Sequence, residues 1–348
     1  MSDVVKPRPL DAWLVPLSGP PVDAIVLHGT QGQTLRLGRH EECEIKLPPD
    51  ADKVSRFHAK FTCDGRRWNL SDNASRWGTV LNGLKLVGGA DMSLREGDLI
   101  RITPWTFAFR TSPPPKRALI AVDDVKQNQT LVRSIRFDEP QPITEDVATL
   151  LLESAAGIHA STDEKELAEV LLDVAVRGTG LSNAAMLRPL DAEGRIEVIA
   201  ARLSPHAGEQ SSFSRSLLAA AASGDVAELG NMDTAAIGQS IVQMNITAAL
   251  CVPLMLGSTV AAYLYLDSRG RSGAMSTAAV RPNATAFCLA LGRMAGLALS
   301  NLKRIDIERR QASVQAELEA AAEASKWILP KRESQIGRFS YVGESRAG

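Results

Sequence analysis

The sequence predicts two folded domains of different class: an all-β sandwich over residues 24–110 and an α+β domain over residues 144–300. Up to Arg110 the apolar residues form short runs bounded by Gly, Pro, Asp or Asn. This is the strand spacing of a sandwich, and no helical period interrupts it. From Thr144 the pattern changes to helices, then strands, then a last helix, which is typical of an α+β fold. A length of 348 residues accommodates both, since a domain takes roughly 150 residues.

Four further segments surround the two domains. Residues 1–23 are rich in proline and are predicted to form an N-terminal arm. Residues 111–143 begin and end with proline-containing runs, which indicates an extended linker. Residues 301–329 continue the last helix as a stalk whose four-three spacing of apolar residues predicts a weak coiled coil. Residues 330–348 form a tail.

The composition is that of an ordinary soluble globular protein, which we expect to be cytoplasmic. Hydrophobic residues make up 45% of the chain and charged residues 23%, and the net charge of -1 provides no field that would attract nucleic acid or an anionic membrane. The N-terminus lacks the apolar core of a signal peptide, and Arg293 interrupts the apolar run at 287–299. The four cysteines are far apart in sequence, so we expect reduced thiols and no zinc site.

The segment 38–83 alternates turn formers with basic and hydroxyl residues. On a β scaffold this pattern places Arg and Ser side chains at loop tips, where they suit a dianionic phosphate. The pattern resembles a forkhead-associated (FHA) domain, a β-sandwich that binds phosphothreonine peptides. The residues that carry the resemblance are Gly38, Arg39, Ser55, Arg56, His58, Gly78, Thr79, Asn82 and Gly83.

The FHA resemblance implies a role for each of these residues. Arg39 would be the main phosphate ligand, Ser55 would contribute its hydroxyl and backbone N–H, and Arg56 would add positive potential. Gly78 and Thr79 would shape the turn that receives the peptide. The supporting residues would be Asn82, which pins the neighbouring loop, together with Gly38, His58 and Gly83.

Trp77 departs from the FHA pattern. The family has Asn at this position, immediately before Gly-Thr, and its amide hydrogen-bonds the peptide backbone. Trp77 offers one indole donor and a large apolar face, so it could contact the ligand or cover a partner domain. The alternative for the whole set is that these residues only shape loops of a sandwich that has lost ligand binding.

The linker contains a candidate phosphorylation site, Thr130, which is close to basic residues. A phosphate on Thr130 would be captured by the nearby pocket at high effective concentration. The alternative is an unmodified loop or strand residue.

Residues 144–300 resemble a GAF domain, through motifs at 214–218, 240–241, 250–254 and 262–267. The resemblance implies either a dimerisation and coupling module or a sensor that binds a small ligand, and the fold alone does not choose between them. We expect a homodimer.

The segment that begins near Trp327 and Pro330 resembles the entry to a SpoIIE-like (PPM-type) serine/threonine phosphatase domain of bacterial signalling proteins. The acidic residues that bind Mn or Mg in that family come later in the chain, so we expect no cofactor, metal or catalytic residue here. The alternative is an irregular tail.

These features predict a cytoplasmic regulator. Its FHA domain would bind a phosphothreonine protein, such as a Ser/Thr kinase, and its GAF domain and helix would dimerise and relay the signal to a phosphatase domain outside this chain. The alternatives are a small-molecule sensor acting through the GAF domain, and a phospho-dependent adaptor or scaffold without a catalytic domain. An enzymatic role is not expected, because the sequence has no paired carboxylates and no nucleophile with a base at useful spacing.

Overall fold

The structure is a computed structural model that describes residues 10–49, 51–113, 132–136, 144–203, 213–229, 246–269, 283–328, 333–336 and 338–342. Two compact units make up the chain, residues 1–304 and residues 305–348. Thr130 and the motif at 240–241 lie outside the described residues.

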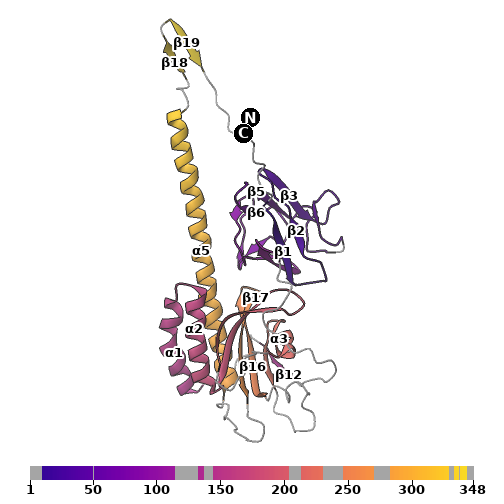
Figure 1. Cartoon of the computed structure of the whole chain (residues 1–348), viewed down its shortest axis with the longest axis vertical. Helices are drawn as coiled ribbons and strands as arrows, with labels where there is room; N and C mark the ends of the chain where they lie inside the picture. Colours follow the sequence, from indigo (N-terminus) through magenta and orange to yellow (C-terminus); the bar gives the residue numbers. More distant parts are fainter. Residues whose placement is uncertain are drawn as a thin grey trace, which may run out of the picture. The chain divides into compact units, whose positions relative to one another are not determined.

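Residues 10–113 form a sandwich of two sheets (Figure 1). The first sheet has the strand order β2-β1-β11-β10-β7-β8 and the second has the order β4-β3-β5-β6-β9. The bounds are β1 (Ala12–Ser18), β2 (Ile25–Leu27), β3 (Gln33–Gly38), β4 (Ile45–Lys46), β5 (Ala59–Cys63), β6 (Trp68–Asp72), β7 (Val80–Leu81), β8 (Leu84–Lys85), β9 (Met92–Ser93), β10 (Leu99–Ile102) and β11 (Trp105–Arg110). Alternate residues of the strands face the core, where Phe61, Trp68 and Phe107 are almost completely buried.

Residues 1–23 were predicted to form an arm outside the sandwich, but the structure has strand β1 within this segment. It pairs antiparallel with β11 through Trp13 and Arg110, and with β2 through Ala12 and Leu27. Leu14 is fully buried. The prolines of this segment concealed the strand, since its alternating pattern is short and its partner β11 is about 90 residues away in sequence.

The second domain is a six-stranded antiparallel sheet with helices on both faces, as Figure 1 shows. Its strand order is β12-β15-β16-β17-β13-β14. The bounds are β12 (Val132–Ile135), α1 (Glu145–Ala160), α2 (Glu164–Thr179), β13 (Asn183–Pro189), β14 (Ile196–Arg202), α3 (Arg215–Ala221), β15 (Val226–Leu229), β16 (Ile246–Leu256), β17 (Thr259–Arg269) and α5 (Ala284–Ile328).

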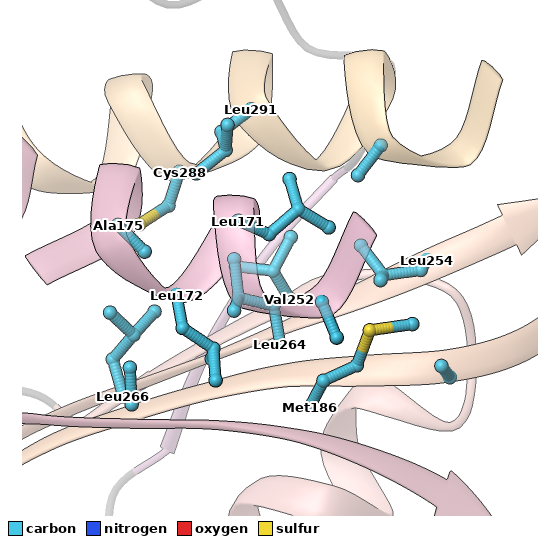
Figure 2. Close-up of a cluster of buried hydrophobic side chains, with 14 of the residues drawn as sticks. Leu171, Leu172, Ala175, Met186, Val252, Leu254, Leu264, Leu266, Cys288 and Leu291 are labelled. Atoms are coloured by element: carbon cyan, nitrogen blue, oxygen red, sulfur yellow. The ribbon is translucent and has the colours of Figure 1, made fainter. Parts of the chain in front are cut away.

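The two faces of this sheet bury two separate apolar clusters. Helices α1, α2 and α5 cover one face, and Figure 2 shows side chains of α2 and α5 meeting those of the strands there, among them Leu171, Leu291 and Val252. Helix α3 covers the other face, where its apolar side chains form a cluster with Cys251 and Tyr265 of the strands. Successive residues of β16 alternate between these clusters because side chains of a strand point to opposite faces.

Strand β12 lies in the segment that was predicted as a linker, residues 111–143. It pairs with β15 at the edge of the second domain's sheet, from Val132 opposite Leu229 to Ile135 opposite Val226. Ile135 is buried. The sheet therefore begins before the predicted boundary at residue 144.

Helix α5 is long and apolar enough to span a membrane by length and composition, with a mean hydropathy of 1.3 in its most apolar stretch. More than half of that stretch, 56%, is buried, and Phe287, Cys288 and Leu291 belong to the core of the second domain. Burial within its own domain accounts for the apolar character of this part of the helix.

The unit formed by residues 305–348 contains the end of α5 and a hairpin of β18 (Glu333–Ile336) and β19 (Phe339–Val342). Along the predicted coiled-coil seam, Ile307 is buried and Leu318 is 61% exposed. The seam is therefore not covered along its whole length.

Candidate functional site

The predicted phosphate ligands lie on loops at one end of the sandwich. Strand register places Leu37 opposite Ala59, and Ala59 opposite Asp72. Since these three residues stand at the ends of β3, β5 and β6, the loops beyond them leave the sheet side by side. One end of the second sheet thus brings together the loop after β3, the loop before β5 and the loop after β6.

Backbone hydrogen bonds join the loop of Arg39 to the loop of Ser55 and Arg56. The amide of Arg39 donates to the carbonyl of Ser55 over 3.3 Å, and the amide of His40 donates to the carbonyl of Arg56 over 3.0 Å. A Cβ atom on Gly38 would lie 2.1 Å from the carbonyl oxygen of Arg56. Glycine at position 38 is therefore required for the close approach of the two loops.

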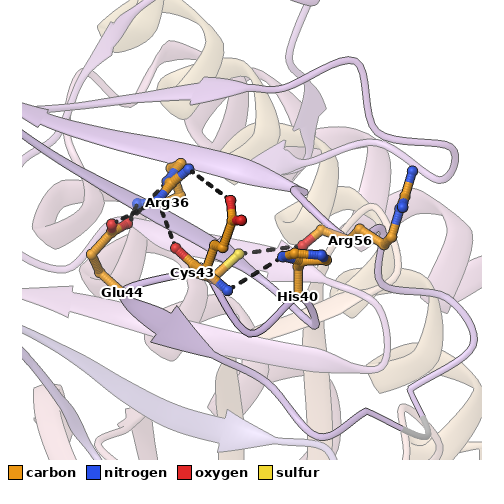
Figure 3. A network of polar contacts seen from close by, with 6 residues as sticks. Arg36, His40, Cys43, Glu44 and Arg56 are labelled. Atoms are coloured by element: carbon orange, nitrogen blue, oxygen red, sulfur yellow. Dashed lines mark hydrogen bonds and ion pairs between the residues drawn. The ribbon is translucent and has the colours of Figure 1, made fainter.

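An ion pair closes the loop after β3. Arg36 Nη2 lies 3.0 Å from Glu44 Oε1, and the hydrogen bond from Arg36 lowers the pKa of Glu44 to about 2. Figure 3 shows this pair next to the contacts of His40 and Cys43, with the guanidinium of Arg56 extending away from them. Arg36 is thus occupied within the loop, whereas Arg39 and Arg56 are exposed at its surface.

Ser55 keeps one donor for a ligand. Its Oγ accepts a hydrogen bond from the amide of Arg76 over 3.0 Å, which leaves the hydroxyl proton available. Its amide donates to Nδ1 of His58 over 3.1 Å. The backbone N–H of Ser55, which was also expected to bind phosphate, is thus already donated to His58 in this structure.

His58 links two of the loops from inside the domain. It is fully buried, and Nε2 lies 3.3 Å from the carbonyl oxygen of Gly78. Since Nδ1 accepts from Ser55, the proton is on Nε2 and is donated to Gly78. Burial lowers the pKa of His58, although the contacts with Gly78 and Asp72 oppose this shift. A neutral His58 therefore connects the loop of Ser55 to the turn at Gly78.

Asp72 organises the turn before β7. Its carboxylate accepts hydrogen bonds from the hydroxyl of Ser75 over 2.6 Å and the hydroxyl of Thr79 over 2.8 Å. The amide of Ser75 also donates to it, and the amide of Gly78 donates to the hydroxyl of Ser75. Burial alone would raise the pKa of Asp72, but these hydrogen bonds outweigh burial and lower it. Sequence reasoning missed Asp72; its signal was the Asp-x-x-Ser spacing of a side-chain-capped turn.

Two predicted site residues are buried and cannot reach a ligand directly. Thr79 is fully buried against Asp72. Asn82 is 2% exposed, its amide donates to Asp98 over 2.8 Å, and its carbonyl oxygen accepts from the amide of Leu99 over 2.9 Å. Asn82 therefore pins the turn before Gly83 to β10, as expected, and contributes to binding only through the position of the loop.

Trp77 is on the surface, with 49% of its area exposed. Trp77 replaces the Asn whose side-chain amide hydrogen-bonds the peptide backbone in the FHA pattern. Two cations flank its indole ring. Lys53 Nζ and Arg76 Cζ each lie 5.8 Å from the ring centroid. Neither cation was predicted as a site residue. Lys53 is on a different loop from Trp77, so its proximity depends on folding, whereas Arg76 directly precedes Trp77 in the sequence.

The second domain contains a cavity of about 280 Å³ beside α3 and the turn between β13 and β14. Charged and apolar side chains line it, including Asp191, Arg195, Arg215 and Leu218. Among the residues that the structure describes, no three His, Cys, Asp or Glu side chains are grouped so that they could hold a metal ion.

The family comparison matches a part of the first domain. The FHA domain family matches residues 35–103. Among curated proteins, none matches this chain.

Three solved structures are similar to parts of the chain. EmbR of Mycobacterium tuberculosis in complex with a low affinity phosphopeptide is 28% identical over 29% of this chain and 24% of EmbR, with a TM-score of 0.25. An FHA domain of a hypothetical protein of Arabidopsis thaliana is 28% identical over 34% of this chain and 98% of that domain, with a TM-score of 0.28. A structure described for phosphothreonine-dependent FHA domain interactions is 25% identical over 30% of this chain and 98% of that one, with a TM-score of 0.25.

All three TM-scores are below 0.5, so the assignment rests on the family match and not on these structures. The match covers both halves of the candidate site, from the loop of Arg39 to the turn before β10. Residues 35–103 of this chain therefore match the FHA domain family, whose members are non-catalytic modules that bind phosphopeptides.

Proposed function

We propose that this chain is the regulatory part of a cytoplasmic signalling protein and that its FHA domain binds a phosphothreonine-containing partner, such as a Ser/Thr kinase or a kinase substrate. The observation that carries the proposal is the close approach of two loops, in which Gly38 lies against the carbonyl of Arg56; it supports a common phosphate site for Arg39, Ser55 and Arg56.

The chemistry of these three side chains suits a phosphate dianion. Two guanidinium groups donate charge-assisted hydrogen bonds, and the free hydroxyl proton of Ser55 supplies a neutral donor. Arg39 and Arg56 form no ion pair with any described carboxylate, so a ligand does not have to displace one. This supports Arg39 as the main phosphate ligand.

The remaining parts would relay the binding event. In this proposal residues 144–300 act as a GAF domain that dimerises, and α5 carries the signal toward a SpoIIE-like phosphatase domain outside this chain. Exposed apolar side chains of α1 and α5, namely Leu152 (76%) and Leu297 (56%), support a contact with a second copy. Mn or Mg would belong to that phosphatase domain, and this chain would need no cofactor. A phosphate on Thr130 would compete with the partner for the same FHA site.

Binding of a degenerate phosphothreonine peptide library to the full chain tests the proposal. Replacing Arg39 by Ala should weaken binding by about 10- to 100-fold, since hydrogen bonds to charged groups contribute about 1.5–3 kcal/mol. Arg66→Ala is the matched control, because Arg66 is exposed in the turn at the opposite end of β5. Equal binding of the phosphorylated and unphosphorylated libraries would refute the proposal.

The cavity beside α3 favours a second function, a small-molecule sensor in the second domain. A screen of nucleotides and metabolites by thermal shift addresses it, since a ligand at 100 times its Kd stabilises by about 2.7 kcal/mol. If neither a small ligand nor a phosphatase partner is found, a phospho-dependent adaptor would be the function that fits the FHA domain.

A further inference from the structure

Trp77 lies in a cluster of basic side chains drawn from separate loops. Lys53 belongs to the loop before β5 and Arg76 to the loop after β6, yet both approach the same indole at 5.8 Å. Cations at this distance from a Trp ring are attracted to its electron-rich face. The indole therefore holds the two charged groups together at the surface.

A third cation, Lys85, borders the same turn. A Cβ atom built on Gly78 would lie 2.2 Å from Cε of Lys85 and 3.0 Å from its Nζ. The stem of Lys85 thus lies over Gly78, and its ammonium group lies beside the residue that follows Trp77. We call Lys53, Arg76 and Lys85 the basic rim.

The basic rim is not neutralised within the described part of the chain. No side chain of the rim forms an ion pair there. Asp72 is near the turn, but it is buried and accepts hydrogen bonds from Ser75 and Thr79. Asp52 is the exposed carboxylate next to Lys53 in sequence. Among the described residues, the three cations of the rim are therefore not paired with a carboxylate.

We propose that Trp77 and the basic rim select phosphothreonine peptides that carry an acidic side chain beside the phosphothreonine. The inference rests on the proposed function of the FHA domain and specifies its ligand class. In place of an amide that would bind the peptide backbone of any sequence, this surface offers an apolar platform flanked by positive charge. A flanking Asp or Glu can place its methylene groups on the indole and its carboxylate between the cations.

Matched peptides test this selection. One phosphothreonine peptide is made with Asp, or with the isosteric Asn, at each flanking position in turn, and its Kd for the full chain is measured by fluorescence anisotropy. We expect Asp to bind about five- to tenfold more tightly than Asn at one position, from two exposed ion pairs that share a carboxylate. The preference should shrink as salt is added.

Variants locate the source of the preference. Lys53→Gln and Arg76→Gln should each reduce the Asp/Asn ratio to about twofold, as expected for the loss of one exposed ion pair. Arg66→Gln removes the same charge at the other end of β5 and should leave the ratio unchanged. Neither Lys53 nor Arg76 uses its side chain in a hydrogen bond among the described residues, so folding should be preserved.

The outcomes separate this inference from the proposed function. Binding that depends on phosphate and on Arg39 but shows equal affinity for Asp and Asn at every position overturns the selection alone. An Asp preference that Arg66→Gln lowers as much as Arg76→Gln also overturns it, since a general field would then be responsible. Absence of phosphate-dependent binding refutes the function itself.

Discussion

Replacement of Gly38 by Ala should separate the two loops that form the proposed phosphate site. The added methyl group would lie 2.1 Å from the carbonyl oxygen of Arg56 and 3.0 Å from that of Ser55. Both atoms belong to the backbone, so no side-chain rotation relieves the contact. The loops must move apart, and the hydrogen bonds from Arg39 and His40 must lengthen.

The magnitude follows from these contacts. An extra methyl group in a tightly packed site costs about 2 kcal/mol, and loss of one backbone hydrogen bond adds about 1 kcal/mol. We expect a total of about 3 kcal/mol, which lowers the Tm of a domain of this size by about 10–20 °C. Phosphopeptide affinity should fall as well, because Arg39 and Ser55 lose their common position.

Thermal unfolding followed by Trp fluorescence measures the effect, since Trp68 and Trp105 are buried in this domain. Gly88→Ala is the matched control: nothing lies within 4 Å of its Cβ position, and we expect a change within about 0.5 kcal/mol. A Gly38→Ala protein that unfolds and binds like the Gly88→Ala protein would show that the close approach of the loops is unimportant.

Three further variants test the supporting contacts by urea unfolding. Asp72→Asn should cost about 2 kcal/mol at pH 7; because the pKa of Asp72 is lowered in the folded protein, its stabilisation is present above about pH 4 and is lost as the pH falls through the folded value. A cost that is equal at pH 7 and pH 3 would contradict this. Burial lowers the pKa of His58, so the wild-type free energy of unfolding should fall as the pH drops below about 6.5, and His58→Asn should lack that slope. Glu164→Gln should destabilise the second domain by about 1–2 kcal/mol, because Arg188, 2.7 Å from Glu164, loses a partly buried partner. The exposed Glu169→Gln is its control, and equal effects of the two would reject the reasoning.

Much of the second domain was predictable because its signals are local. Asp163 caps α2 by accepting a hydrogen bond from the amide of Glu166, and Gly180 ends the helix in the left-handed conformation with φ of 75°. Both are recognisable from residue type and spacing. The continuous apolar run around Cys251 likewise indicates a strand that is buried on both faces, which the structure has as β16.

The candidate site was predictable in part. Arg39, Ser55 and Arg56 were expected at loop tips, and the register of β3, β5 and β6 brings their loops together. The turn chemistry of Gly38 was also visible in the sequence. What each polar atom binds was not visible, because the partner of a side chain is decided by folding and not by its neighbours in sequence.

The amino-acid sequence by itself determined the order of strands and helices, the caps, and the residue types that suit a phosphate, since these depend on contacts between residues a few positions apart. The tertiary structure decided which of those residues are exposed and which polar atoms are already hydrogen-bonded. It buried Thr79 and Asn82, assigned the amide of Ser55 to His58, and placed Lys53 beside Trp77. It also paired β1 with β11 and β12 with β15, each about 90 residues away, because strand pairing satisfies backbone groups regardless of their separation along the chain.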